Sequence, residues 1–325
     1  RVYSVIMDIW WYRNNLKKTS ENKFEMMKVY AINSYSNAVC NNFRSIRANL
    51  TSMFWDENTS TDNLEIGLKN YLSLLNDALH PNLSSSENDK KSVEFSNKMR
   101  KLVTFSWNQS VCKENEAVCT DIAFDMFNIL FQAGLFFSIK ARNTVLELQN
   151  YNEESITSAF RNLKKAAGYF QKSREIAKSF LMESFNGDAY RKPSDLDDRI
   201  VTAHYLQCMG EATELAIMRA KENKLKAEVI SELNIQAINH YRQACRELAS
   251  FSTKTTQQLL KWITFINLKT QLIEVRSYHT LSQVMLNQEK CGHALRCIRE
   301  CSEGIKLLQK LVKQFENSHS PHNKE

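Results

Sequence analysis

One stretch of the chain indicates its fold class most clearly: LKAEVISELNIQAINHYRQACRELAS, from Leu225 to Ser250. Apolar residues recur in it every three or four positions, which is the spacing of one face of an α-helix. Neither glycine nor proline interrupts the pattern, so one continuous helix is predicted. The core-facing stripe of this helix consists of Ile230, Ala237, Tyr241, Cys245 and Leu248.

A second apolar row lies along the N-terminal half of the same predicted helix. Leu225, Val229 and Leu233 follow the spacing i, i+4, i+8 and widen the apolar face. A neighbouring helix of the same chain can bury such a row. Alternatively, the row forms an exposed groove that accepts the amphipathic helix of a partner protein. The residues alone leave both interpretations open.

Helices are predicted over most of the remaining chain as well. Only 7 glycines and 3 prolines occur in 325 residues, far below the averages of about 7% and 5%. The predicted helices cover about 36–54, 61–79, 116–143, 153–181, 195–223, 225–250, 254–287 and 289–316. Long helices joined by short turns pack as antiparallel hairpins that stack into a solenoid. The expected fold class is therefore all-α.

A few segments depart from the helical pattern. Residues 1–35 carry aromatic and β-branched side chains without helical periodicity, which predicts an extended segment or a short hairpin. The alternating stretch from Val103 to Trp107 favours a strand, and the polar residues 82–98 favour an exposed loop. We predict one domain over residues 1–316, helical from residue 36 onward, followed by a polar tail at 317–325.

Composition narrows the class of protein and its compartment. Hydrophobic residues make up 43% and charged residues 24%, which is typical of a soluble globular protein. The most apolar stretch, Met126 to Ile139, is shorter than the roughly 20 residues that span a bilayer, so a buried core helix is predicted. The eight cysteines are spread over apolar helical positions, which favours free thiols in a reducing compartment and hence a cytoplasmic protein.

The net charge of +7 favours acidic partners or anionic membrane surfaces without specifying either. No block of lysine and arginine is dense enough to indicate a nucleic-acid partner.

The first candidate for chemistry is a group of metal-binding residue types near the C-terminus: Cys291, His293, Cys297 and Cys301. On a helix, Cys291 and His293 differ by about 200° and cannot both point at one ion. Buried thiols acting as small apolar residues are therefore the preferred interpretation. A hydrolase or metal enzyme that uses these cysteines stays as the rival hypothesis.

Catalytic patterns are otherwise absent from the sequence. The seven histidines offer no local arrangement of nucleophile, base and orienting group, and there is neither a glycine-rich phosphate loop nor a G-x-S-x-G motif. We predict a protein that is not an enzyme, with no cofactor, no metal and no small-molecule substrate.

Several short motifs follow one another in a definite order along the chain. Residues Trp11 to Lys17 read WYRNNLK. Further motifs are Cys40 to Arg44, Leu163 to Phe170, Glu211 to Glu214, Lys261-Trp262, Leu268-Lys269, and Lys290 to Gly292 with Ala294. In their order and spacing, from about residue 10 to residue 316, these motifs resemble the Bro1 domain family, whose N-terminal segment reads W-F-x-R-N-x-L-K.

The resemblance implies a boomerang-shaped helical solenoid with a tetratricopeptide-like core and a small N-terminal sheet region. Bro1 domains bind the C-terminal amphipathic helix of charged multivesicular body proteins, which belong to ESCRT-III, on their concave face. Carried over to this chain, the binding positions fall on Ala216, Val229 and Leu233, with Leu225 in the same row and an acidic contact at Glu153. The implied role is a noncatalytic adaptor in endosomal sorting and membrane remodelling, either cytoplasmic or peripheral on endosomal or other intracellular membranes.

Three features depart from the family pattern. Ala216 stands where some relatives have a large aromatic residue, which predicts a shallower pocket and weaker binding. The chain stops at Glu325, before the family's further helix and returning extended segment. It also stops without the prenylated C-a-a-X box of the short family members. A general helical scaffold that kept the fold but binds a different protein is therefore the alternative function.

Overall fold

The computed structural model describes most of the chain, in two compact units. The described residues are 12–20, 34–79, 100–101, 103–111, 116–148, 152–182, 185, 192–251 and 256–317. Unit 1 comprises Arg1–Arg13, Phe137–Gly168 and Asp197–Glu325, and unit 2 comprises Asn14–Phe136 and Tyr169–Leu196.

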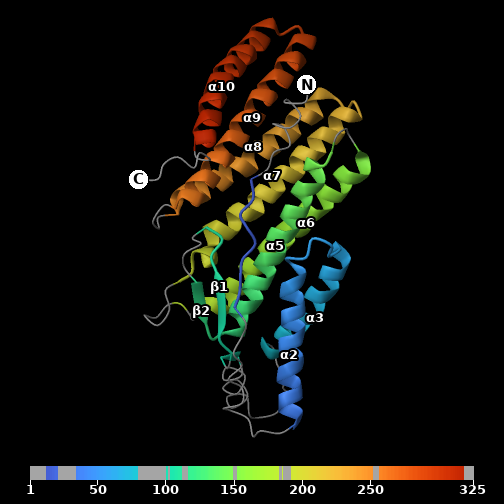
Figure 1. The fold of residues 1–325 in the computed structure, drawn as a ribbon. Helices are drawn as coiled ribbons and strands as arrows, with labels where there is room; N and C mark the ends of the chain where they lie inside the picture. The colour runs from blue at the N-terminus through green and yellow to red at the C-terminus, as the bar shows by residue number, and fades with distance from the viewer. Residues whose placement is uncertain are drawn as a thin grey trace, which may run out of the picture. The chain divides into compact units, whose positions relative to one another are not determined.

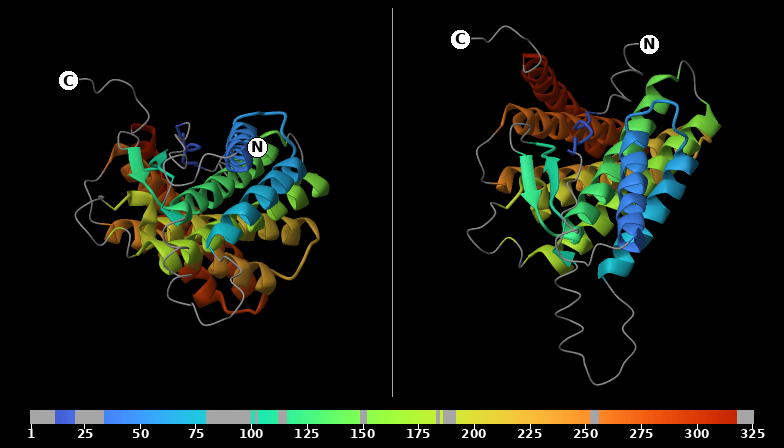
Figure 2. Two further views of the ribbon diagram at one scale, coloured as in Figure 1. Left: turned by 90° about the horizontal axis from the view of Figure 1, so that it is seen from below. Right: turned by 60° about the horizontal axis from the view of Figure 1, so that its bottom comes forward.

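Four long helices dominate unit 1, and each packs against the next one along the chain (Figures 1 and 2). They are α7 (Asp198–Glu222), α8 (Ala227–Ser250), α9 (Gln257–Asn287) and α10 (Cys291–Asn317). Unit 1 also includes the C-terminal part of α5 (Ile122–Leu146) and the N-terminal part of α6 (Glu153–Ile176). This stacking of helices confirms the predicted all-α fold class.

The local sequence explains where these helices begin and how the chain reverses between them. The carboxylate of Asp197 accepts the Arg199 N–H at 3.0 Å and caps α7, because the first N–H groups of a helix have no partner within it. The hydroxyl of Thr256 caps α9 in the same way. The turns after α7 and α9 pass through the left-handed residues Lys224 (φ 51°) and Glu289 (φ 59°), a conformation that ends many helices.

The interior of unit 1 is closely packed around α7. Gly210 lies against the ring of Tyr241, and a Cβ at position 210 would be only 2.9 Å from its Cζ atom. Helix α9 is joined to α7 by the indole Nε1 of Trp262, which donates a hydrogen bond to Gln207 Oε1 at 2.7 Å. Both aromatic side chains are fully buried. Helix α7 is thus fixed by direct contacts with α8 and with α9.

The described part of unit 2 contains two complete α-helices, a small antiparallel sheet, and the remaining parts of α5 and α6. The helices are α2 (Ser34–Met53) and α3 (Thr61–Leu79), and the strands are β1 (Phe105–Asn108) and β2 (Glu116–Cys119). Residues 14–20 form no helix, and Thr19 forms a single antiparallel bridge with Trp107 of β1. The predicted non-helical N-terminal segment is confirmed over these residues, whereas residues 1–11 and 21–33 lie outside the described part of the chain.

One buried carboxylate organises the core of unit 2. Asp125 of α5 accepts hydrogen bonds from Arg47 Nη2 at 2.8 Å, from the Tyr71 hydroxyl at 2.6 Å and from Trp107 Nε1 at 2.7 Å. These donors come from α2, α3 and β1. Because a buried charge must be paired and hydrogen-bonded, the same carboxylate ties three elements to α5.

The predicted helices are confirmed, but some begin later than predicted: α7 begins at Asp198 instead of residue 195, and α8 begins at Ala227 instead of Leu225. The prediction of a helix from residue 116 is wrong at its start, because Glu116–Cys119 forms β2 and pairs with β1. Helix α5 begins only at Ile122, after Asp121, whose carboxylate accepts the Ala123 N–H at 2.8 Å. The strand predicted near Val103 to Trp107 is confirmed as β1. The sheet therefore lies inside the region predicted to be helical from residue 36 onward, and the loop predicted at 82–98 lies outside the described residues.

Helix α5 is the most apolar element of the described chain. Among the described residues it is the one helix whose length and composition would suit a membrane span, yet 94% of its most apolar window is buried within the protein. This burial fits the predicted core helix over Met126 to Ile139.

Candidate functional site

The predicted apolar row is accessible, although only Val229 and Leu233 lie on α8, since the helix begins at Ala227 and Leu225 lies in the turn before it. Leu225 is 48% exposed, Val229 is 41% exposed, and Leu233 is half-buried. Their neighbour Ile230, on the core-facing stripe, is buried. The exposure of Leu225 and Val229 argues against the alternative in which a neighbouring helix of the described chain covers the whole row.

Ala216 lies on α7 beside this row. It is half-buried, and the contact between Gly210 and Tyr241 fixes the antiparallel register of α7 and α8. Ala216 lies six residues after Gly210, in the direction of the turn between the two helices. The same number of residues before Tyr241 leads to about residues 233–236 of α8, so Ala216 lies at their level. The Leu225 N–H donates to the Ala220 carbonyl at 2.9 Å, so the row begins directly against the last turns of α7.

Glu153, the first residue of α6, reaches the same region of α7. Its carboxylate accepts a hydrogen bond from Arg219 Nη2 at 3.1 Å, and the two side chains are 64% and 40% exposed. An ion pair this exposed stabilises by at most about 1 kcal/mol. Arg219 lies one helical turn from Ala216, which brings the two α7 residues and Glu153 to one surface.

Four of the five predicted residues lie on three helices of unit 1: Glu153 on α6, Ala216 on α7, and Val229 and Leu233 on α8, while Leu225 lies in the turn between α7 and α8. We refer to Glu153, Ala216, Leu225, Val229 and Leu233 as the docking surface. The surface combines an exposed apolar row with a weakly held ion pair at its edge.

Arg219 is a residue of this region that the sequence did not predict. Its Nη2 pairs with Glu153, while its Nε is buried without a hydrogen-bond partner. The only signal in the sequence is its i+3 spacing from Ala216, and many surface arginines share such a spacing with an apolar residue. The pairing with α6 is a tertiary contact that periodicity cannot show.

Two buried glutamates hold α7 in place from within the core. Glu211 pairs with Arg13 at 2.5 Å, and Glu214 pairs with Lys269 at 2.7 Å. Glu214 also accepts a hydrogen bond from the Tyr241 hydroxyl. Burial raises the pKa of Glu214, opposed by the nearby charge of Lys269. Since removal of one partner leaves the other buried and unpaired, these pairs fix the position of α7.

The described residues give no support to metal or thiol chemistry. Among them, no group of three or more His, Cys, Asp or Glu side chains could hold a metal ion. The described cysteines are free thiols: Cys119, Cys208, Cys245, Cys291, Cys297 and Cys301. Burial raises the pKa of Cys119 to about 11, and only the ionised thiolate is a nucleophile or metal ligand.

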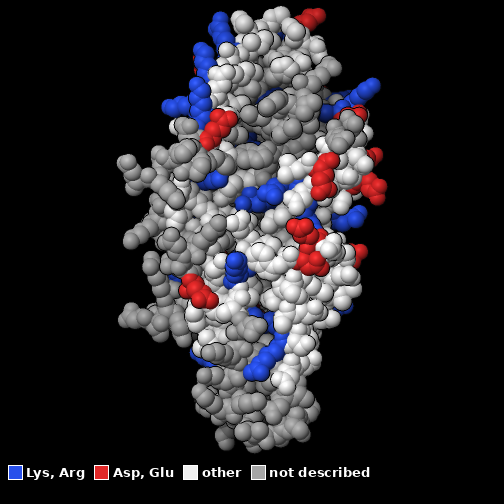
Figure 3. Space-filling model, in the orientation of Figure 1, with Lys and Arg blue, Asp and Glu red and all other residues white. Residues whose placement is uncertain are grey.

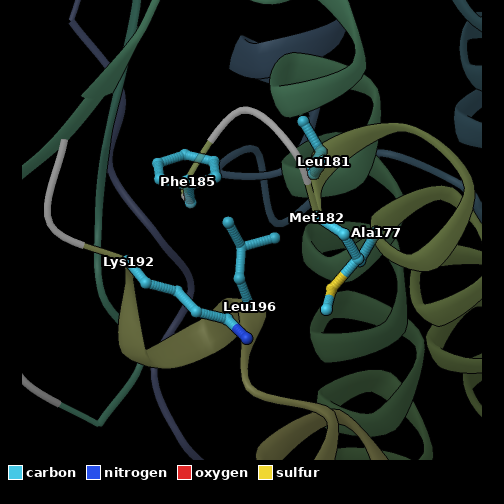
Figure 4. Close-up of a pocket in the computed structure, with 6 residues that line it drawn as sticks. All are labelled: Ala177, Leu181, Met182, Phe185, Lys192 and Leu196. Carbon is cyan, nitrogen blue, oxygen red and sulfur yellow. The ribbon is translucent and has the colours of Figure 1, made fainter. Parts of the chain in front are cut away.

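A small pocket in unit 2 lies beside the π-helical turn Ala177–Leu181 (Figure 4). It has a volume of about 270 Å³ that includes open solvent. Its lining residues are Ala177, Leu181, Met182, Phe185, Lys192 and Leu196. Apart from the Lys192 ammonium the lining is apolar, so the pocket offers no pair of groups for acid–base or nucleophilic catalysis.

Basic charge gathers on the last helix of unit 1. Figure 3 shows lysine and arginine side chains along the outer edge of α10. The exposed basic residues of α10 are Arg296, Arg299, Lys306, Lys310 and Lys313. A basic stripe of this kind favours contact with anionic surfaces but selects no particular partner.

Comparison with protein families and curated proteins gives one consistent result. A family model described as "BRO1-like domain" matches residues 29–324. The BRO1 domain-containing protein BROX of Danio rerio is 26% identical over 315 residues, which cover 97% of this chain and 72% of the relative. The human BROX is 27% identical with the same coverage.

Comparison with solved structures shows the same fold. ALIX in complex with the SIVmac239 PYKEVTEDL late domain has a TM-score of 0.69 at 15% identity, covering 95% of this chain and 44% of ALIX. The BRO1 domain of ALIX in its CHMP4C complex has a TM-score of 0.64 at 16% identity, covering 95% and 86%. A Bro1 domain solved as a structure basis for endosomal targeting has a TM-score of 0.63 at 16% identity, covering 95% of this chain and 84% of that domain.

Proposed function

Because this chain belongs to the BRO1-like domain family, we propose that it is a noncatalytic adaptor whose docking surface binds the C-terminal amphipathic helix of an ESCRT-III charged multivesicular body protein. The observation that carries the proposal is the exposure of Leu225 and Val229 beside Ala216 and Glu153. An amphipathic helix lays apolar residues spaced i, i+3, i+4 and i+7 into such a surface.

The relatives support the choice of partner class. The ALIX BRO1 domain, which has the same fold, has been solved with CHMP4C. The apolar row offers two exposed anchors, Leu225 in the turn before α8 and Val229 on α8. Truncation of one anchor in such an interface costs about 1 to 3 kcal/mol of binding free energy. The half-buried Ala216 offers less side-chain area than an aromatic residue, so we expect weaker binding than in relatives with an aromatic residue there.

The proposal is tested by calorimetric titration of the protein with a synthetic peptide from the C-terminus of CHMP4C. Replacement of Val229 by aspartate places a charge in the apolar contact without disturbing the core, because Val229 is 41% exposed. We expect V229D to weaken binding about 10-fold or more, equivalent to roughly 1.4 kcal/mol. Far-UV circular dichroism and thermal unfolding check that V229D stays folded.

Ile235→Asp is the matched control. Ile235 is 52% exposed and lies on the same helix, on the flank that faces α9, where Arg242 pairs with Glu274 at 2.8 Å. I235D introduces the same charge on the same helix away from the docking surface and should leave affinity unchanged. The site is contradicted if V229D leaves binding intact or if both variants weaken it equally. The function is contradicted if the wild-type protein does not bind the peptide.

The alternative function is a general helical scaffold that recognises a different protein. The small side chain of Ala216 is the specific feature that favours it, because this position departs from relatives with an aromatic residue. An unbiased interaction screen that returns partners dependent on Val229, but no ESCRT-III subunit, would support the scaffold instead.

The proposed site of action is the cytoplasm and the cytoplasmic side of endosomal membranes. A Bro1 domain of the same fold is described as a basis for endosomal targeting, and the exposed basic stripe of α10 is compatible with a peripheral contact to anionic lipid.

A further inference from the structure

A polar side chain, His240, lies on α8 two helical turns beyond Leu233, the last residue of the apolar row. His240 lies seven residues after Leu233, which keeps it on the same flank of α8 at a distance of about 10 Å along the helix. The imidazole is half-buried, and its Nε2 atom is buried without a hydrogen-bond partner. An unpaired buried polar atom costs free energy, and a rotation of the half-buried ring that brings Nε2 to a docked ligand group would recover it.

Lys164 of α6 lies beside His240. It follows Glu153 by eleven residues, or about three helical turns, so both residues lie on one face of α6. Both residues also contact α7. The Lys164 Nζ atom is 3.9 Å from Met209 Sδ, and Glu153 accepts a hydrogen bond from Arg219. Met209 precedes Gly210, which lies against Tyr241, the residue after His240, so Lys164 and His240 flank the same level of α7. The charge of Lys164, after burial, lowers the pKa of His240.

The two ends of this surface differ in their charge balance. At one end, Glu153 and Arg219 neutralise each other. At the other end, the exposed Lys164 has no carboxylate partner among the described residues. The nearest turns of α7 carry Glu211 and Glu214, but both are buried and already paired in the core. A positive charge is therefore left without a counter-charge where the α8 row ends.

We propose that Lys164 and His240 form an anion subsite that binds a carboxylate side chain of the docked helix, two helical turns from the residue that packs on Leu233. This inference rests on the proposed function and adds a chemical requirement on the partner: an acidic residue about seven positions from an apolar anchor. A helix that runs along α8 has the same rise per residue, so the spacing is matched. The subsite also fixes the direction of the docked helix, because reversal would place a different residue at Lys164.

The subsite is tested with the same CHMP4C peptide in a set of charge-removing variants. Lys164→Gln should weaken binding about 3- to 10-fold, as expected for a rim charge with a specific partner, and His240→Leu should cause a smaller loss. Lys310→Gln on α10 removes the same net charge from an exposed side chain outside the docking surface and should have no effect. Each acidic residue of the peptide is then replaced in turn by its amide.

A double-mutant cycle identifies the bound carboxylate. At a single peptide position, replacement of the acidic residue by its amide should weaken binding to the wild-type protein. With that amide peptide, K164Q should cause no additional loss of affinity. Equal losses for K164Q and K310Q, or the absence of coupling to any peptide carboxylate, overturn the subsite. If V229D abolishes binding while K164Q has no effect on affinity, the docking surface is supported and only the subsite is overturned. A peptide that does not bind the wild-type protein overturns both.

Discussion

Glu211 shows how much of unit 1 depends on single buried charges. Its carboxylate pairs with Arg13 at 2.5 Å, and the two side chains are 0% and 5% exposed. Burial acts to lower the pKa of Arg13, but the charge and hydrogen bonds of Glu211 outweigh it, so the pKa is raised overall. Glu211→Gln removes the negative charge beside this buried guanidinium, and we expect the free energy of unfolding to fall by about 3 to 5 kcal/mol in chemical denaturation.

The comparison variant is Glu274→Gln. Glu274 pairs with Arg242 at 2.8 Å, but the Arg242 side chain is 56% exposed, so we expect E274Q to cost no more than about 1 kcal/mol. Equal losses in E211Q and E274Q would show that burial of the ion pair is not what makes it important.

His240 gives a prediction about pH and stability. Burial and the charge of Lys164 lower its pKa from the ordinary 6.5, so the unfolded chain binds a proton at this residue more tightly than the folded protein. Stability therefore falls as the pH drops through about 6.5 toward the lowered value. Between roughly pH 7.5 and 5.5, we expect wild type to lose more of its free energy of unfolding than His240→Gln. Parallel pH profiles for the two proteins would contradict this assignment.

At the scale of residues, the sequence placed the apolar row but did not decide whether a neighbouring helix covers it, and it did not reveal contacts between helices. The i, i+4, i+8 spacing placed Leu225, Val229 and Leu233 on one flank of a helix, and the structure leaves the first two exposed. The pairing of Glu153 with Arg219 joins residues 66 positions apart, and no local pattern reveals such a contact. The anion subsite was missed for the same reason, since Lys164 and His240 lie on different helices.

At the scale of elements, Gly210 controls how closely α7 and α8 approach. A methyl group there would lie 2.9 Å from the Tyr241 ring, and the Tyr241 hydroxyl is held by Glu214, so the ring cannot move aside freely. We expect Gly210→Ala to lower the free energy of unfolding by about 1 to 3 kcal/mol, despite the better helix propensity of alanine.

Gly168 of α6 supplies the control. A Cβ at this position meets nothing within 4 Å, so Gly168→Ala should be stabilising by about 0.5 to 1 kcal/mol through helix propensity alone. Destabilisation by both alanines to the same extent would mean that the contact with Tyr241 does not limit the approach of the helices.

The helices could be predicted where the local sequence alone determines them. The strands were harder to predict, because a strand depends on the backbone of a second strand with which it pairs. The predicted range 61–79 agrees with α3 at both ends, because its leucine spacing and flanking residues mark the helix locally. Residues Glu116–Cys119 instead form a strand because β1 offers backbone hydrogen bonds. The short sequence contains apolar residues that suit either structure, and only the partner strand selects one.

At the scale of the whole molecule, the sequence indicated the family more firmly than the domain organisation. Collinear motifs pointed to the Bro1 family, and the family model over residues 29–324 confirms it. The described chain forms two compact units, with α5 and α6 divided between them. Helical periodicity is local and cannot reveal such a division, so a single domain over residues 1–316 stays a prediction.

The central claim is that the docking surface, and not another face of unit 1, holds a partner helix. Photo-crosslinking measures this most directly, with p-benzoylphenylalanine placed at position 229 in one protein and at position 235 in another, each mixed with the CHMP4C peptide. Because both positions are exposed on α8, both probes are equally available to solution. We predict a peptide adduct, mapped by mass spectrometry, from position 229 and none from position 235. An adduct from position 235 alone, or equal adducts from both, would contradict the docking surface.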